Sequence, residues 1–412
     1  MDMMRQYITK KRIFAVVFII CLLAFSAYNM YTCRKALWDK ALKQFKEKKI
    51  DTQALESTMQ DKILWKYAFI EIHGALQKAM GKQEVGNFTY VKDKNGFMLN
   101  SGFYMEDDPR ILEYAVRIKK LKDLAERHGT KLLFVVTPPK YNKDYTVLGK
   151  GMPVNDPEGT TRELLMYLHR LGIETLDLSE YLPNEEIPYD EAFFRTDHHW
   201  TVPASFRATQ ILADTIKDRF GEDLDPDGRY LAESLYEKKL YRKGMLGAMG
   251  RRAGVIYSGL EDCMILFPKF TGNYKWKGTT DSGRTKEKEG SFTEVLMDLD
   301  NLSDDNNYYI NTQYGTYLNG LYSIDNVENL DNTDGPSIFM IRDSYFSPVI
   351  SFLMPAVSRV DAVWALFENE DFHILHYLAE QYRSGKAYDY MIIEIYPYNI
   401  EDKAFRFFRE SR

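Results

Sequence analysis

Strand-like apolar runs separated by amphipathic helical patterns constrain this fold more than any other feature of the sequence. The run KLLFVV contains no alternating polar residues, which is typical of a strand covered on both faces at the centre of a parallel sheet. Strand-like runs lie at residues 131–136, 173–178, 337–341, 359–366 and 389–397. Between them, residues 110–129, 160–172 and 373–385 carry apolar residues at helical spacing and end at a glycine. The alternation predicts a three-layer α/β/α domain with a mostly parallel central sheet.

Three local patterns refine this prediction. Asn95-Gly96 between apolar segments predicts a hairpin turn. Residues 193–221 begin as an extended segment and continue as a helix, with Thr201 as a capping residue and Pro203 in the first turn. Residues 230–335 are rich in Gly, Tyr, Asn and Asp and break the alternation. We interpret this last segment as short strands and loops that form an irregular insertion or the far edge of the sheet.

The N-terminus contains a candidate membrane anchor. The run from Ile13 to Tyr31 is apolar except for Ser26 and Asn29, and at 19 residues it spans about 28 Å as a helix. The basic residues before it favour a cytoplasmic N-terminus, with the remaining chain outside the cell membrane. A cleaved signal peptide is the alternative, but no clean small-x-small cleavage site precedes Arg34. We therefore expect an uncleaved single-pass anchor.

These patterns divide the chain into three parts. Residues 1–35 form a cytoplasmic basic tip and a transmembrane anchor. Residues 36–89 carry helical spacing with abundant Lys and Glu, and we expect a membrane-proximal stalk. Residues 90–412 form the α/β domain.

Composition excludes some functions. A net charge of −6 argues against a nucleic-acid-binding protein. The chain has 29 Tyr and 24 Phe, and such rings suit sugar binding, although filling of the core is the simpler role. Cys21 lies in the apolar run and Cys33 just past it, so Cys263 has no partner for a disulfide within the domain.

The segment FFRTDHHWT at residues 193–201 concentrates the chemistry of the chain. In an extended backbone, Asp197 and His199 point to one side and His198 to the other. A carboxylate in this position fixes the tautomer of the imidazole and leaves its other nitrogen free as a base. Ser344 follows an apolar strand and precedes a helix, so its hydroxyl is exposed at a strand-to-helix turn. The three residues fit a Ser-His-Asp arrangement for acyl transfer.

Two other interpretations of this segment stay open. In the first, the three residues are structural: Asp197 caps a turn, and both histidines are polar residues with satisfied hydrogen bonds. In the other, Asp197, His198 and His199 bind a metal ion, although the remaining histidines form no motif with them. We expect no metal site.

TDHHWT resembles the signature of the DHHW protein family. That family is similar to the alginate O-acetylation proteins AlgJ and AlgX, whose catalytic domain is SGNH-hydrolase-like. Supporting matches are KNGFMLNSG, VVTPPKYN, GAMGRRAG, LEDCMILFP, RDSYF and DYMIIEIYP, so the resemblance covers roughly residues 90–400. It implies that Ser344 is the nucleophile, His199 the base and Asp197 the orienting acid.

The resemblance implies roles for four further residues. The backbone N–H of Tyr345, after the nucleophile, contributes to an oxyanion hole. Lys140 of the Pro-Pro-Lys turn lines the site, although a solvated loop lysine fits as well. Arg195 contacts substrate or pairs with a carboxylate. Trp200 is a sugar platform or a core residue.

The chain departs from the pattern of a classical SGNH enzyme. The order here is Asp, His, then Ser, which does not exclude the triad geometry. Arg342 lies two residues before the serine, where a glycine normally eases the turn. Asp343 is a further candidate acid.

The resemblance implies a membrane-anchored, extracytoplasmic O-acetyltransferase of a bacterial cell envelope that modifies an exopolysaccharide. No cofactor is expected, because a donor delivered across the membrane supplies the acetyl group. The implied partners are an MBOAT-type membrane O-acyltransferase and the polysaccharide synthesis machinery. The alternatives are an acetylesterase with the same triad and a non-catalytic polysaccharide-binding or scaffold subunit.

Overall fold

The computed structural model describes residues 2–46, 51–101, 108–302, 308–311, 313–367 and 372–408. The chain forms two compact units, Met1–Leu76 and Gln77–Arg412. The first unit contains helix α1 (Asp2–Lys46), helix α2 (Thr52–Gln60) and most of helix α3 (Lys66–Ala79). Within the described residues, one segment, Thr9–Phe45 of α1, is long and apolar enough to cross a membrane.

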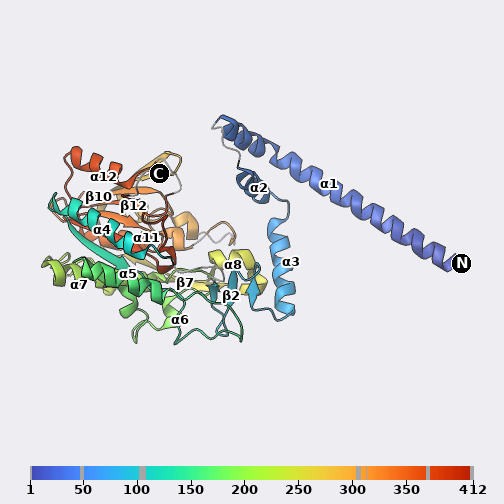
Figure 1. Cartoon of the computed structure of the whole chain (residues 1–412), viewed down its shortest axis with the longest axis horizontal. Helices are drawn as coiled ribbons and strands as arrows, with labels where there is room; N and C mark the ends of the chain where they lie inside the picture. The colour runs from blue at the N-terminus through green and yellow to red at the C-terminus, as the bar shows by residue number, and fades with distance from the viewer. Residues whose placement is uncertain are drawn as a thin grey trace. The chain divides into compact units, whose positions relative to one another are not determined.

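An eight-stranded sheet forms the centre of the second unit (Figure 1). Its strands, in spatial order, are β5 (Glu174–Asp177), β4 (Lys131–Val136), β13 (Tyr390–Ile395), β11 (Ser337–Arg342), β12 (Arg359–Trp364), β10 (Ile324–Asn329), β8 (Asn273–Thr279) and β9 (Thr285–Ser291). From β5 to β12 each neighbouring pair is parallel. The pairs from β12 to β9 are antiparallel. The predicted mostly parallel sheet is confirmed.

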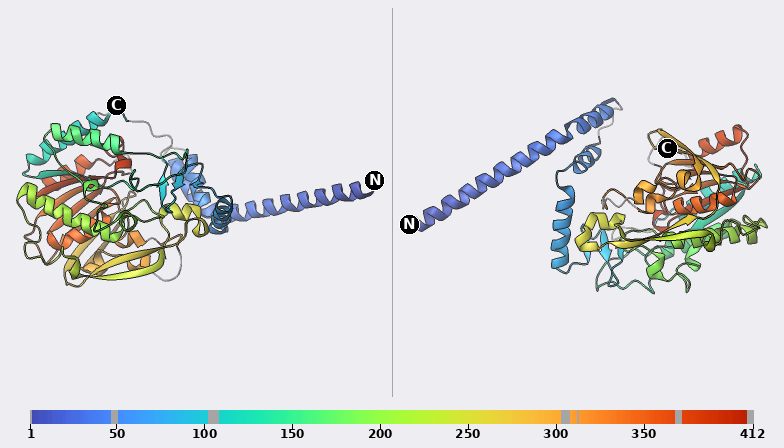
Figure 2. Two further views of the ribbon diagram at one scale, coloured as in Figure 1. Left: turned by 90° about the horizontal axis from the view of Figure 1, so that it is seen from below. Right: turned by 180° about the vertical axis from the view of Figure 1, so that it is seen from behind.

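Helices cover both faces of the sheet (Figure 2). Along β4, Leu133 and Val135 belong to one core cluster, while Leu132 and Phe134 belong to the other. The first cluster includes residues of α7 (Val202–Phe220) and α11 (Phe346–Leu353). The second includes residues of α4 (Ile111–Glu126), α5 (Glu158–Arg170) and α12 (Ile374–Arg383). Two cores separated by one sheet make the three-layer architecture that the apolar runs predict.

The segment 230–335 contributes the far edge of the sheet. Strands β8, β9 and β10 lie there, with the short helix α10 (Phe292–Val295). The same segment contains an antiparallel hairpin of β6 (Tyr236–Met245) and β7 (Glu261–Pro268). The connection between β6 and β7 holds the short helices α8 (Ala248–Ala253) and α9 (Val255–Ser258).

A small sheet precedes the large one in sequence. It consists of β1 (Glu84–Val85), β2 (Tyr90–Lys92) and β3 (Met98–Asn100), all antiparallel. Gly96 has φ 91°, a left-handed conformation that glycine adopts readily, in the turn between β2 and β3. The predicted hairpin at Asn95-Gly96 is therefore confirmed.

Candidate active site

Ser344 lies at the turn between a central strand and a short helix. Strand β11 pairs with β13 and β12 on its two sides and ends at Arg342, and α11 begins at Phe346. The side chain is partly exposed at the carboxyl end of the parallel strands, where ligands bind in sheets of this kind. The strand-to-helix turn that the sequence predicts is present.

A loop between α6 (Tyr189–Ala192) and α7 brings two more site residues to this turn. His199 Nε2 lies 2.7 Å from Ser344 Oγ, and His199 Nδ1 lies 2.6 Å from Asp197 Oδ1. Both distances are those of hydrogen bonds. Residues that are 145 positions apart in the chain are thus joined in one hydrogen-bonded chain.

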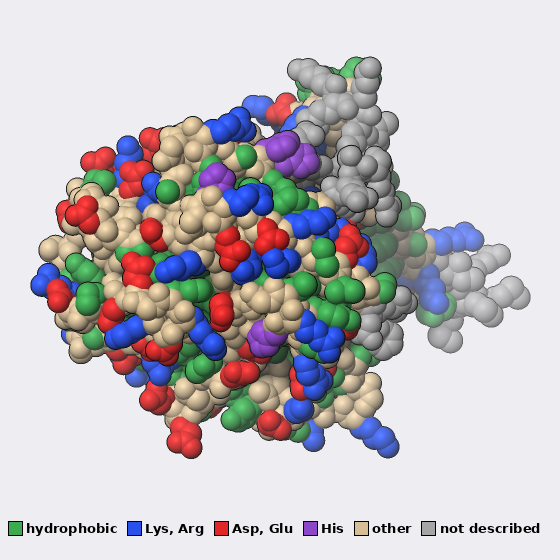
Figure 3. Space-filling model, turned by 60° about the vertical axis from the view of Figure 1, so that its left-hand side comes forward, with side chains coloured by type: hydrophobic (Ala, Val, Ile, Leu, Met, Phe, Trp, Pro, Cys, Tyr) green, Lys and Arg blue, Asp and Glu red, His purple; other side chains and the backbone are tan. Residues whose placement is uncertain are grey.

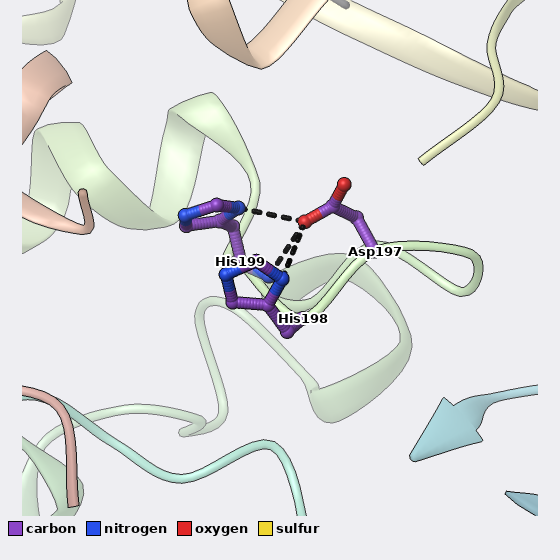
Figure 4. Close-up of side chains that lie close together, drawn as sticks. All are labelled: Asp197, His198 and His199. Atoms are coloured by element: carbon purple, nitrogen blue, oxygen red, sulfur yellow. Dashed lines mark hydrogen bonds and ion pairs between the residues drawn. The ribbon is translucent and has the colours of Figure 1, made fainter. Parts of the chain in front are cut away.

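His198 does not point away from this group, so the prediction for its side chain is wrong. Its Nδ1 lies 3.3 Å from Asp197 Oδ1, the same oxygen that His199 contacts, and the two rings are 3.8 Å apart (Figure 4). The cause is the backbone, which bends through these residues instead of running extended. Desolvation and the neighbouring His199 lower the pKa of His198 to about 3, which keeps the ring neutral.

The carboxylate of Asp197 stays ionised. Burial opposes its charge, but both imidazoles and the backbone N–H of Ala248 hold its pKa well below the usual range. Ala248 N–H donates to Asp197 Oδ2 over 2.6 Å. Ligand atoms of Asp197, His198 and His199 also lie within 4.8 Å of one another, a spacing that could hold a metal ion. Both Nδ1 atoms, however, are directed at the carboxylate rather than at a common point beside it.

Two motifs that carried the family resemblance hold this loop in place. The carboxylate of Glu261 accepts hydrogen bonds from the backbone N–H groups of Arg195 and Thr196, over 2.6 and 2.9 Å. Gly247, at the start of GAMGRRAG, packs so closely that an added Cβ would lie 2.5 Å from the Cβ of Asp197. The two motifs therefore position the Asp197 carboxylate, a role that sequence reasoning did not identify.

Lys140 neither lines the site nor lies in solvent. Its Nζ is buried and donates to the backbone carbonyls of Met98, Arg195 and Asp197 over 2.7, 3.1 and 2.6 Å. Burial lowers the pKa of Lys140 to about 8. The lysine thus ties the strand β3 to the loop that carries Asp197.

Arg195, Trp200 and the backbone N–H of Tyr345 are the remaining predicted site groups. Arg195 is exposed, with its guanidinium 5.5 Å from the ring centre of Phe97. Trp200 is fully buried and donates its indole N–H to the Tyr345 carbonyl, so it packs in the core and the sugar-platform interpretation is wrong. The backbone N–H of Tyr345 donates to Asp343 Oδ1 over 2.9 Å. In this conformation it is not free to bind an oxyanion, in contrast to the prediction.

Asp343 organises the turn rather than the imidazole. Besides the N–H of Tyr345, its carboxylate accepts hydrogen bonds from the backbone N–H of Tyr396 and the side chain of Asn399, over 2.8 and 3.0 Å. The N–H of Asp343 donates to Glu394 over 2.8 Å, and burial raises the pKa of Glu394 well above its ordinary value. A neutral Glu394 beneath the turn avoids a second buried charge beside Asp343.

Sequence reasoning missed Tyr314. Its ring stacks on His199 with centroids 3.8 Å apart, and its hydroxyl lies within hydrogen-bonding distance of the Ser344 and Tyr345 carbonyls. The residue comes from the irregular segment after β9, where many tyrosines occur in similar surroundings. No local pattern distinguishes it from the others.

A cavity of about 720 Å³ lies at the carboxyl ends of β4 and β5. Pro138, Asp177 and Pro397 are among its lining residues, whereas Ser344 and His199 are not. On the face shown in Figure 3, acidic and basic side chains are interspersed, and neither sign dominates among the described residues.

Part of the chain that contains the Asp197 loop matches a known protein family. Residues 97–250 match a family model described as SGNH hydrolase-like domain, acetyltransferase AlgX. None of the curated protein sequences matches the chain. The matched residues include the Asp197 loop and end before Ser344.

Solved structures share the fold. Bacillus cereus PatB1 is similar with a TM-score of 0.58 and 15% identity, over 77% of this chain and 99% of PatB1. A PatB1 structure with a sulfonyl adduct gives a TM-score of 0.57 and 15% identity, over 78% and 97% of the two chains. A DHHW family protein from Eubacterium siraeum gives 0.56 and 14%, over 77% and 94%. The predicted resemblance is confirmed: residues 97–250 match the family model of the SGNH hydrolase-like acetyltransferase domain of AlgX, and the fold is similar to that of a DHHW family protein.

Proposed function

We propose that this protein is a membrane-anchored, extracytoplasmic O-acetyltransferase that acetylates hydroxyl groups of an exopolysaccharide. The observation that carries the proposal is the hydrogen-bonded chain from Asp197 through His199 to Ser344. The match to an acetyltransferase family supports the transferred group. The candidate span in α1 supports the anchor.

In the first half-reaction, His199 Nε2 removes the proton of Ser344 Oγ as this oxygen attacks the acetyl carbonyl of the donor. Asp197 accepts the hydrogen bond from Nδ1–H, fixes the tautomer and stabilises the imidazolium that forms. The leaving group takes the proton from His199, and the acetyl group stays on Ser344 as an ester. The backbone N–H of Ser344 has no hydrogen-bond acceptor among the described residues, which suits an oxyanion donor.

In the second half-reaction, a sugar hydroxyl gives its proton to His199 and attacks the acyl-serine. The new sugar ester leaves, and Ser344 Oγ recovers the proton. The donor is a group delivered across the membrane, and an MBOAT-type membrane protein is the partner that supplies it. A tether on the same membrane raises the effective concentration of the two proteins.

Water can replace the sugar in the second step, since the Ser344 side chain is partly exposed. The same residues then form an acetylesterase. A scaffold subunit, in contrast, needs no reactive serine.

One experiment separates these functions. The full chain in detergent is incubated with a small acetyl ester and a panel of oligosaccharides, and the products are weighed by mass spectrometry. Ser344→Ala removes the nucleophile, and Ser282→Ala, in an exposed turn, is the matched control. An acetylated oligosaccharide lost only in Ser344→Ala supports transfer, and acetate without a sugar product supports hydrolysis.

A second readout tests the serine itself. Because PatB1 has been solved with a sulfonyl adduct, a sulfonyl fluoride is a suitable probe. We expect a single adduct on Ser344 that is absent in His199→Ala. A chain that gives neither turnover nor an adduct contradicts both enzymatic functions and leaves the scaffold.

A further inference from the structure

An exposed apolar stripe runs along α3. Trp65, just before the helix, and Phe69, Ile72 and Leu76 within it recur at the spacing of one helix face. Their exposed fractions are 65%, 49%, 58% and 57%. A contiguous apolar face of this kind marks a contact with lipid or with another protein. All four residues belong to the first compact unit, so the contacts within that unit bear on what covers them.

The chain folds back along α1 before it reaches the stripe. Near the end of α1, the Gln44 side chain exchanges hydrogen bonds of 2.9 and 3.2 Å with the backbone of Asp51. Further along, the backbone N–H of Leu64 donates to Asn29 Oδ1 over 2.8 Å. Later residues after α1 thus bond to earlier residues of α1: Asp51 to Gln44, and Leu64 to Asn29. Residues 51–64 therefore run back toward the apolar span from which the chain emerged.

Asn29 explains how the returning backbone is accommodated. It is one of the two clearly polar residues in the apolar run, and it is buried. Its side-chain Nδ2 donates to the Phe25 carbonyl over 2.9 Å, while Oδ1 accepts the Leu64 N–H. Backbone groups without partners are costly at the depth of a bilayer. Asn29 satisfies one such group in the loop before α3.

A residue near the start of the stripe, Phe69, contacts a residue inside the apolar run, Phe25. The rings of Phe25 and Phe69 meet edge-to-face, with centroids 5.9 Å apart. Phe25 lies six residues before Tyr31, so this contact is about 9 Å inside the end of the run. Trp65 has φ 61°, a conformation that a bulky side chain rarely adopts. An indole held there at the edge of an apolar span matches the aromatic residues found at membrane interfaces.

We propose that residues 63–76 lie in the extracytoplasmic interface of the lipid bilayer, with the stripe from Trp65 to Leu76 in contact with acyl chains. The proposal rests on the membrane anchor of the proposed function. The continuity of the stripe with the apolar run favours lipid over a second protein as its occupant. The second unit begins at Gln77, directly after the stripe, so the catalytic unit is tethered through a segment that itself lies in the interface.

Two exposed tryptophans provide the test. Trp38 lies on α1 about 10 Å beyond Tyr31 and is 70% exposed, which makes it a control for Trp65. The full chain is reconstituted into phosphatidylcholine vesicles that carry bromine on the acyl chains. Fluorescence of wild type minus Trp65→Phe isolates Trp65, and wild type minus Trp38→Phe isolates Trp38. We expect Trp65 emission to be blue-shifted and quenched several-fold more strongly than Trp38 emission, most by bromine close to the headgroup.

The outcomes are separable. A long-wavelength Trp65 emission that bromine does not quench overturns the proposal. A blue-shifted but unquenched emission also overturns it and indicates that protein covers the stripe. Flotation of the vesicles tests the anchor, and sulfonyl labelling of Ser344 in the same sample tests the catalytic proposal. A chain that does not float refutes the anchor together with this inference, whereas a floating chain with an unquenched Trp65 refutes this inference alone.

Discussion

Replacement of Lys140 by methionine tests how the site is held together. Methionine keeps the apolar stem of the side chain but removes the ammonium that donates to three backbone carbonyls. The Arg195 carbonyl also accepts the backbone N–H of Met98 over 2.8 Å, so the carbonyls of Met98 and Asp197 are the ones that lose a donor. A buried acceptor left without a donor costs about 1–3 kcal/mol, so the loss is on the order of 2–6 kcal/mol. Two of the three carbonyls belong to Arg195 and Asp197, so the loop should relax and Asp197 should move from His199.

We expect two measurable effects of Lys140→Met in the full chain in detergent. The melting temperature, followed by tryptophan fluorescence, should fall by on the order of 10 °C. Turnover of a small acetyl ester, measured below that melting temperature, should fall at least about tenfold, since a displaced carboxylate misorients the base. Lys143→Met is the matched control. Lys143 is exposed and pairs with Glu158 over 3.1 Å, a surface contact that contributes little to stability.

The reasoning fails if Lys140→Met melts and turns over like Lys143→Met. Such a result would mean that water or a shifted backbone satisfies the three carbonyls, and that the lysine does not position the loop. A loss of stability without loss of turnover in the folded protein would leave Lys140 as a purely structural residue.

Four further predictions follow from the same geometry. Asp197→Asn should lower kcat for the acetyl ester by roughly 10³-fold or more without a comparable loss of melting temperature, because the tautomer is no longer fixed. Gly247→Ala should lower both stability and turnover, because its Cβ would lie 2.5 Å from Asp197, whereas Gly159→Ala, with nothing within 4 Å, should change neither. Tyr314→Phe, which keeps the stacked ring, should lose less activity than Tyr314→Leu, as kcat measurements would show. The folded pKa of Lys140, about 8, lies below the 10.5 of a free lysine, so the unfolded chain binds more protons between these values. The free energy of unfolding in urea should therefore rise from pH 8 to pH 10 relative to Lys140→Met, by about 2 kcal/mol.

The sequence predicted the parts of the site that depend on local pattern. The apolar run of β11 followed by an apolar helix specifies the turn that exposes Ser344. The Asp-x-His spacing puts a carboxylate within reach of an imidazole in almost any loop conformation. That is why Asp197 and His199 meet although the backbone is bent and the prediction of an extended segment was wrong.

Long-range contacts determine what the sequence did not reveal. A lysine after two prolines is a typical loop residue in sequence. Lys140 is buried because β3 and the Asp197 loop place their backbone carbonyls around its ammonium group. The position of His198 depends on the bend of that loop. The backbone N–H of Tyr345 donates to the side chain of Asp343, two residues earlier. From the sequence, Asp343 was a further candidate acid and not a hydrogen-bond acceptor for this N–H.

The irregular segment 230–335 supplies several of the site contacts that the sequence pattern did not reveal. It supplies the N–H of Ala248, the carboxylate of Glu261 and the ring of Tyr314, all of which contact the Asp197 loop or His199. These contacts need backbone at van der Waals distance from the loop, which the missing side chain of Gly247 permits. Ala248 is the first residue of α8 and Glu261 is the first residue of β7, so these contacts come from the ends of short elements, where the chain changes direction. The irregularity that hides these residues from periodicity analysis is thus the same property that lets them position the carboxylate.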